Sequence, residues 1–295
     1  MHQRTLSERI FNVFNYAILI VLCIVTIYPL WHVAMASISD PLAVYAKRGF
    51  YFIPAMPYNF LGYKLVMENP NISSGFLNTL FYVVVGTAIS MFLTITGAYV
   101  LSRKGVYWNK HIMKGIIFTM YFQGGLIPFY LLLMNLGMRD SRWAIILPIA
   151  VNTFNLIIMR TAFDGVSDSM VESAKLDGAT DWLIIWRIMV PLAQATVAVI
   201  ALFYGVRMWN EWFNPALFLS TKSKFPLQLI LREILINNDT SGMRPMGVIG
   251  QSQQESYRLL VKYCTIIVGT IPILIVYPFL QRYFVKGIMI GGVKG

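Results

Sequence analysis

The sequence has few charged residues and few of the residues that build metal centres in soluble proteins. Charged side chains make up 13% of the 295 residues, about half the fraction usual for a soluble domain. Cys23 and Cys264 both lie in apolar runs, where a thiol behaves as a small hydrophobic group and indicates neither a disulfide framework nor a metal site. His2, His32 and His111 are far apart in the sequence and fit no zinc-ligand spacing.

Motifs for nucleotide binding and nucleophilic catalysis are also absent from the sequence. No Gly-Lys dipeptide occurs, which excludes the phosphate-binding loop G-x-x-x-x-G-K-[ST]. Neither a G-x-S-x-G nucleophile elbow nor an H-E-x-x-H metal motif is found. The net charge of +11 is spread over loops without a basic stretch, so anionic lipid head groups are a better partner than nucleic acid. These absences favour a conduit or transporter over a membrane-bound enzyme.

Apolar residues are abundant and lie in blocks. They make up 57% of the chain, and the mean hydropathy is +0.62. A bilayer core takes about 20 helical residues, and six uncharged runs reach or approach that length. These runs are 13–39, 69–102, 115–138, 143–159, 188–206 and 263–281. We therefore predict an all-α integral membrane protein with six transmembrane helices.

The runs divide the chain into a short N-terminal segment, 1–12, one six-span domain, 13–285, and a C-terminal tail, 286–295. The first run is longer than the roughly 7 to 15 residues of a signal-peptide core, so we expect a retained helix and not a cleaved leader. An even number of spans puts both termini on one side. Lys and Arg are nearly balanced between the two sides, so their count does not decide the orientation.

Polar residues interrupt two of the predicted spans. Arg207, Asn210, Glu211 and Asn214 have the spacing i, i+3, i+4 and i+7 in a fifth span, 193–219, which places them on one helix face. Charged groups in a span face protein or a water-filled cavity, so this stripe either lines a pathway or contains an Arg207–Glu211 pair that holds helices together. Gln123 lies beside two glycines in the third span, where we expect a kink next to the pathway.

The loop 163–192 is the most polar segment between two spans. Ser169 and Glu172 have the S-x-x-E spacing of a capping box, and Gly178 supplies a left-handed stop. A helix of about nine residues is too short to persist alone in water, so it needs a docking surface. One interpretation is a surface helix that lies on the membrane, and the other is a helix that docks on a partner protein.

The same loop carries a longer motif. Its string is Glu172-Ser173-Ala174-Lys175-Leu176-Asp177-Gly178-Ala179, followed at 188–192 by Ile-Met-Val-Pro-Leu. This string resembles the EAA signature of ABC-importer permeases, in which E-A-A and a glycine three residues later precede I-x-L-P at fixed spacing. Ser173, Val190 and Ala195 depart from the pattern without changing its helix-Gly-helix form. Segments 121–128, 155–160, 209–212 and 286–295 are similar to carbohydrate permeases of the LplC/YtcP type, which resemble MalG.

The resemblance implies a fold, partners and a location. The fold would be that of a type I (MetI-like) importer permease, in a bacterial plasma (inner) membrane with both termini and the loop 163–192 in the cytoplasm. The partners would be a second permease in a heterodimer, two ATPase subunits and an external solute-binding protein. The chain itself would be no enzyme and bind no cofactor, because ATP and Mg would be held by the ATPase subunits.

Residues 172–179 would then form the coupling helix that enters a cleft on an ATPase, although Glu172 could serve only as a cap. Pathway-lining residues would include Gln123, Arg207, Asn210, Glu211 and Asn214. The cargo of such permeases includes uronate-containing oligosaccharides, such as those from pectin or alginate. The alternative function is an ion-coupled secondary transporter or channel that works alone, and the EAA string argues against it because a lone transporter needs no such helix.

Overall fold

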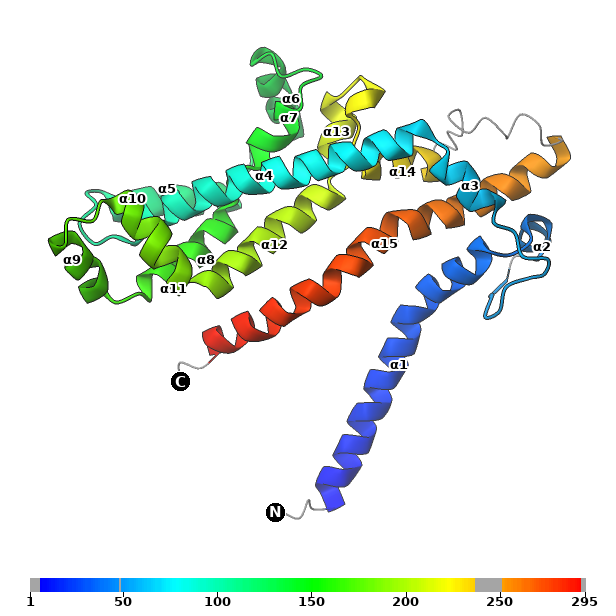
Figure 1. Ribbon diagram of the computed structural model, residues 1–295, viewed down its shortest axis with the longest axis horizontal. Helices are drawn as coiled ribbons and strands as arrows, with labels where there is room; N and C mark the ends of the chain where they lie inside the picture. The colour runs from blue at the N-terminus through cyan, green and yellow to red at the C-terminus, as the bar shows by residue number, and fades with distance from the viewer. Residues whose placement is uncertain (1–5, 48, 237–250, 293–295) are drawn as a thin grey trace. The chain divides into compact units, whose positions relative to one another are not determined.

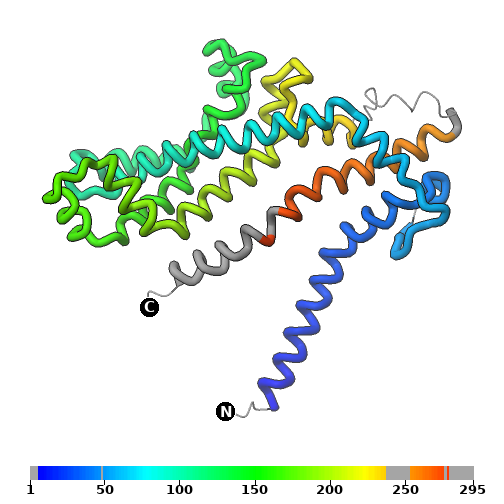
Figure 2. The backbone as a smooth tube through the Cα atoms, in the orientation of Figure 1, coloured from blue at the N-terminus to red at the C-terminus, as the bar shows by residue number. Residues whose placement is uncertain are grey.

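The computed structural model describes residues 6–47, 49–236 and 251–292, and over these residues the chain is helical, without a strand. Figures 1 and 2 show the course of the chain from α1 to α15, and the chain divides into two compact units. The first comprises residues 1–70 and 233–272, and the second comprises residues 71–232 and 273–295.

The first unit contains α1, α2, α3 and the N-terminal part of α15. Their bounds are α1 Leu6–Ser37, α2 Pro41–Ala46, α3 Leu61–Met67 and α15 Gln251–Gly292. α1 is the first predicted span, and its apolar side chains are exposed over most of its length. The segment after α1 contains two short helices, since Asp40 caps α2 by accepting from the Ala43 N–H at 2.9 Å and α3 follows.

α3 packs closely against α15 within the first unit. A Cβ added at Gly62 would lie 2.7 Å from the Cys264 Sγ, so only glycine permits this approach. The Cys264 thiol is buried and donates to the Ser37 carbonyl at 3.3 Å. This cysteine therefore serves as a small packing group, as its position in an apolar run predicts.

The second unit contains α4, the helices that follow it as far as Arg232 within α14, and the C-terminal part of α15. They are α4 Pro70–Ser102, α5 Asn109–Tyr121, α6 Leu126–Asn135, α7 Trp143–Ile146, η1 Leu147–Ile149, α8 Thr153–Asp164, α9 Asp168–Leu176, α10 Asp181–Ile184, η2 Ile185–Met189, α11 Val190–Leu192, α12 Gln194–Asn210, α13 Phe213–Phe218, η3 Lys222–Lys224 and α14 Leu227–Ile236. Figure 1 shows α4 and α12 running alongside each other. The Thr94 and Tyr204 hydroxyls join these two helices at 2.7 Å, and both side chains are buried.

The number of spans agrees with the sequence, but three of them are bent. α1, α4 and residues 253–275 of α15 are each long and apolar enough to cross a membrane, and three bent helix pairs raise the number to as many as six. The bend is 113° between α5 and α6, 48° between α7–η1 and α8, and 91° between α10–α11 and α12. The prediction of six apolar spans is therefore confirmed, and the sequence did not indicate how sharply three of them turn.

The end of the chain continues the last helix. α15 runs through residues 286–292, so most of the predicted tail is helical in the described part of the chain. Residues 293–295 of the tail lie outside the described residues.

Candidate functional site

The polar loop 163–192 folds as a short helix, a glycine turn and a second helical segment. α9 begins at Asp168, two residues earlier than a capping box at Ser169 requires, and its N-cap Ser167 makes no capping hydrogen bond to the backbone. The Ser167 and Ser169 hydroxyls instead contact each other at 2.7 Å. The predicted capping box is therefore wrong, and Glu172 is an exposed side chain one turn into the helix.

The predicted stop at Gly178 is confirmed. Gly178 has φ +82°, in the left-handed region that L side chains rarely adopt. Its N–H donates to the Lys175 carbonyl at 3.0 Å, and the Ala179 N–H donates to the Ala174 carbonyl at 2.9 Å. This pair of hydrogen bonds is the Schellman motif, and it fixes the angle at which the chain leaves the nine-residue helix α9.

One face of α9 packs against the rest of the second unit, and the opposite face is exposed. Val171 is buried, and Ala174 packs against the core formed by α4, α8 and α12. Glu172, Ser173 and Leu176 are exposed, and Leu176 has 89% of its surface open to solvent. This exposed face of α9 therefore takes no part in the packing of the second unit.

Two ion pairs and a phenol attach this loop to its neighbours. Lys104, after α4, binds Asp168 at 2.6 Å, and this hydrogen bond lowers the pKa of Asp168 below its usual value. The Asp181 carboxylate accepts from the Tyr99 hydroxyl at 2.6 Å and pairs with Lys175 at 3.2 Å. Asp181 thus joins the end of α4 to both α9 and α10.

Tyr99→Phe tests this attachment. We expect it to raise the amide hydrogen-exchange rate of residues 168–179 about threefold, because a hydrogen bond to a charged carboxylate is lost and α9 is held less firmly to α4. The measurement is hydrogen–deuterium exchange of the purified protein. Tyr107→Phe is the control, since Tyr107 lies in the turn after α4 with 85% of its surface exposed. An unchanged exchange rate in Tyr99→Phe would show that the Tyr99–Asp181 contact does not hold α9 in place.

The stripe of four polar residues predicted in the fifth span does not lie on one continuous helix. α12 ends at Asn210, and Glu211 has an extended backbone with ψ 112°. The Glu211 carboxylate accepts from the Asn214 N–H at 3.0 Å, so it stabilises the start of α13. The prediction of one face failed because a helix break at 211–212 cannot be read from the i, i+3, i+4, i+7 spacing.

Arg207 and Glu211 do not pair. Both belong to the part of the chain that the structure describes, and no ion pair of 4.0 Å or less joins them or joins Arg207 to another described residue. Arg207 and Asn210 are exposed, and the Asn210 amide donates to the Val206 carbonyl at 2.9 Å. Arg207 therefore projects a free guanidinium from a helix that is otherwise largely apolar.

Gln123 lies in the break between α5 and α6. Gly125 has φ +85°, and Gln123 is exposed. The expected kink is therefore a full interruption, which membrane depth permits only against protein or a cavity.

A polar cluster that the sequence analysis missed joins three segments of the second unit. Asp140 accepts from the Ser220 and Thr221 N–H groups at 3.0 and 3.1 Å and from Lys224 at 2.7 Å. Lys224 and Thr221 hold the pKa of Asp140 well below its usual range. Arg142 donates to Asn78 at 2.9 Å. The sequence showed only charges in a turn, because the partners are about 80 residues away.

Comparisons with known proteins agree with this arrangement. No family model matches the chain. The chain is 38% identical over 291 residues to the polygalacturonan/rhamnogalacturonan transport system permease protein YtcP of Bacillus subtilis, covering 98% of this chain and 100% of that protein. It is also 38% identical over 298 residues to protein LplC of the same organism, covering 100% and 98%.

A solved structure is similar as well. It is described as a bacterial ABC transporter involved in the import of the acidic polysaccharide alginate. The TM-score is 0.86 at 31% sequence identity, over 96% of this chain and 100% of that one. The similarity thus extends over nearly the whole fold.

Proposed function

Since the chain belongs to the family of permease subunits of ABC-type oligosaccharide importers, we propose that α9 is its coupling helix and that Arg207 and Gln123 line its pathway. The chain is an integral membrane transport component and not an enzyme. The observation that carries the proposal is the geometry of α9, which is short, ends in a rigid glycine turn and exposes Leu176.

The proposed assembly is that of an ABC importer, of which this chain is one permease subunit. A second permease would complete the pathway as a heterodimer, two ATPase subunits would supply ATP and Mg, and an external binding protein would deliver the cargo. The loop 163–192 and both termini would then lie in the cytoplasm of a bacterial inner membrane, with the turn 136–142 outside. Asn210, Glu211 and Asn214 stay near the pathway in this proposal, although Glu211 acts mainly on the start of α13.

Coupling requires that α9 contact the closed and open ATPase pair differently, because a ligand with equal affinity for two states shifts no equilibrium. Residues 172–179 supply the candidate contacts, with Glu172, Ser173 and Leu176 on the exposed face. The Tyr99–Asp181–Lys175 contacts would carry a displacement of α9 into α4, and the helical segment α10–α11 would carry it into α12. The rigid Schellman turn keeps α9 from rotating independently.

The proposed cargo is a uronate-containing oligosaccharide. YtcP is named for the transport of polygalacturonan and the similar solved structure for the import of alginate, and both of these polysaccharides are acidic. A free guanidinium at Arg207 suits a carboxylate, because arginine can bind one through two parallel hydrogen bonds.

Copurification tests the proposal. The tagged full-length chain, extracted from its native membrane in mild detergent, should bring down a second permease and an ATPase whose hydrolysis rises when loaded binding protein is added. Isolation of the chain without any ATPase, together with uptake driven by an ion gradient, would instead establish a secondary transporter or channel.

A further inference from the structure

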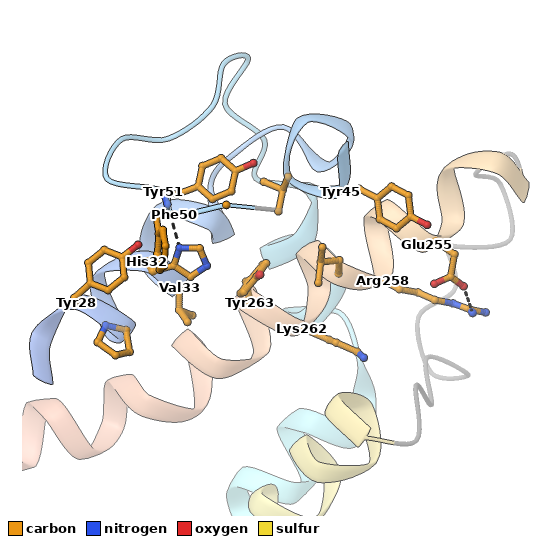
Figure 3. A pocket seen from close by; sticks show the side chains of 14 residues that line it. Tyr28, His32, Val33, Tyr45, Phe50, Tyr51, Glu255, Arg258, Lys262 and Tyr263 are labelled. Carbon is orange, nitrogen blue, oxygen red and sulfur yellow. Dashed lines mark hydrogen bonds and ion pairs between the residues drawn. The ribbon is translucent and has the colours of Figure 1, made fainter. Parts of the chain in front are cut away.

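A second candidate site lies in the first unit, far in sequence from α9 and Arg207. A cavity of about 890 Å³ is lined by the end of α1, by α2 with the loop after it, and by the start of α15. That volume is within the range of small-molecule sites. Figure 3 shows Tyr28, His32 and Tyr51 at one end of the groove, and Glu255 and Arg258 with the Tyr45 ring near them at the other.

The aromatic end offers hydrogen-bond donors as well as ring faces. The His32 Nδ1 accepts from the Tyr51 N–H at 3.2 Å, so Nε2 carries the ring proton and is available as a donor. The His32 ring lies 6.2 Å from that of Tyr28 and meets the Tyr263 ring edge-on at 5.9 Å. The buried Tyr28 hydroxyl has no hydrogen-bond partner among the described residues.

The Tyr28 hydroxyl is covered by its neighbours, so a ligand in the groove would meet the ring of Tyr28 and not its hydroxyl. The Tyr28 ring lies 5.6 Å from that of Phe50 and 5.1 Å from that of Phe52. Ring surfaces are therefore the main feature of this end of the groove.

The other end of the groove is cationic. The Arg258 guanidinium binds Glu255 at 2.8 Å, while Lys262 forms no ion pair with any residue in the described ranges. Arg258 and Lys262 are four residues apart on α15, which puts them on one helix face. Two cations and one carboxylate leave a net positive charge, so this end favours an anion.

The groove lies where the spans meet water. Tyr28 and His32 are in the last turns of α1, and Lys262 directly precedes the apolar run 263–281. In the orientation proposed above, this level is the external surface of the membrane, where the cargo arrives.

We propose that this groove binds an acidic oligosaccharide on the external side, with a uronate carboxylate at Arg258 and Lys262 and a sugar ring among Tyr28, His32 and Tyr263. The inference rests on the proposed function for the orientation and the cargo class. Sugar hydroxyls would hydrogen-bond to the His32 Nε2–H, and flat sugar faces would pack on the rings. An anionic lipid head group has the same charge but no flat apolar face, and the experiment separates the two.

The test uses the complex that copurifies with the full-length chain, placed in phosphatidylcholine nanodiscs without the external binding protein. Trigalacturonate and trimannuronate are titrated by calorimetry, with their methyl esters as uncharged counterparts. We expect at least one acid to bind and its ester to bind about tenfold more weakly, since charge-assisted hydrogen bonds are lost. Lys262→Met should weaken binding of the acid by about fivefold or more.

Lys64→Met is the matched control, because Lys64 belongs to the same unit, lies outside the groove and forms only an exposed pair with Glu68 at 3.9 Å. It should bind the acid as the wild type does. Tyr28→Leu, which removes one of the ring surfaces, should weaken binding while the complex still assembles.

The outcomes are distinct. Absence of binding by either acid, equal binding of acid and ester, or unchanged binding in Lys262→Met would each overturn the proposal. If the wild type bound no sugar and Lys262→Met lost the phosphatidylglycerol that copurifies with the wild type, the groove would be a lipid site. That result would overturn the proposal as well. The proposed function fails separately, by the absence of a copurifying ATPase, which no groove variant affects.

Discussion

Gly178→Val should lower the ATPase stimulation by loaded binding protein about tenfold while membrane insertion and assembly remain intact. Gly178 holds φ +82° at the end of α9, and a left-handed conformation costs an L residue about 1–2 kcal/mol, which is about tenfold in an equilibrium. No atom outside the local chain lies within 4 Å of an added Cβ. The strain is therefore confined to the turn, and relieving it tilts α9 away from the ATPase cleft.

Two variants make this result specific to the turn. Gly178→Asn should retain most of the stimulation, because asparagine tolerates the left-handed region. Gly105→Val is the control, since Gly105 lies in the turn after α4 with open space around it and no positive φ. The measurement is ATP hydrolysis by the reconstituted complex, and wild-type stimulation in Gly178→Val would remove α9 from the coupling role.

Arg207→Ala should reduce uptake of an acidic oligosaccharide about tenfold or more while the complex still assembles. Arg207 has no partner among the described residues, so its removal leaves no buried charge unpaired and should not destabilise the helix bundle. Loss of one guanidinium–carboxylate contact accounts for the effect. Uptake of labelled trigalacturonate by proteoliposomes is the measurement, with assembly checked beside it by size-exclusion chromatography.

The charge swap distinguishes lining from pairing. If Arg207 and Glu211 only paired, Arg207→Glu with Glu211→Arg would be tolerated. The structure predicts failure for a second reason, because an arginine at 211 cannot accept the Asn214 N–H that Glu211 now binds. Glu211→Gln is the control, since its amide oxygen keeps that hydrogen bond, and it should support near-normal uptake. A fully active Arg207→Ala would show that this side chain does not contact the cargo.

Some local features of residues 167–179 could be determined from the sequence, and others could not. Gly178 was predictable as the stop, because no other residue type takes a left-handed position so readily. The start was not, since serines occur at 167 and 169 and both could cap. The structure places the N-cap at Ser167 and the first residue of α9 at Asp168, with Val171 buried one turn into the helix.

By itself the sequence determined the class of protein, the approximate positions of the apolar spans and the family motif at 172–192. Each of these depends on residue composition or on spacing along the chain, which local sequence records directly. Only the tertiary structure decided where the spans break, that Glu211 stabilises α13 instead of pairing with Arg207, and that Asp140 joins the loop at 220–224. It also brought Tyr28, His32 and Tyr263 together, because contacts between residues more than 200 positions apart depend on packing and leave no periodic signal.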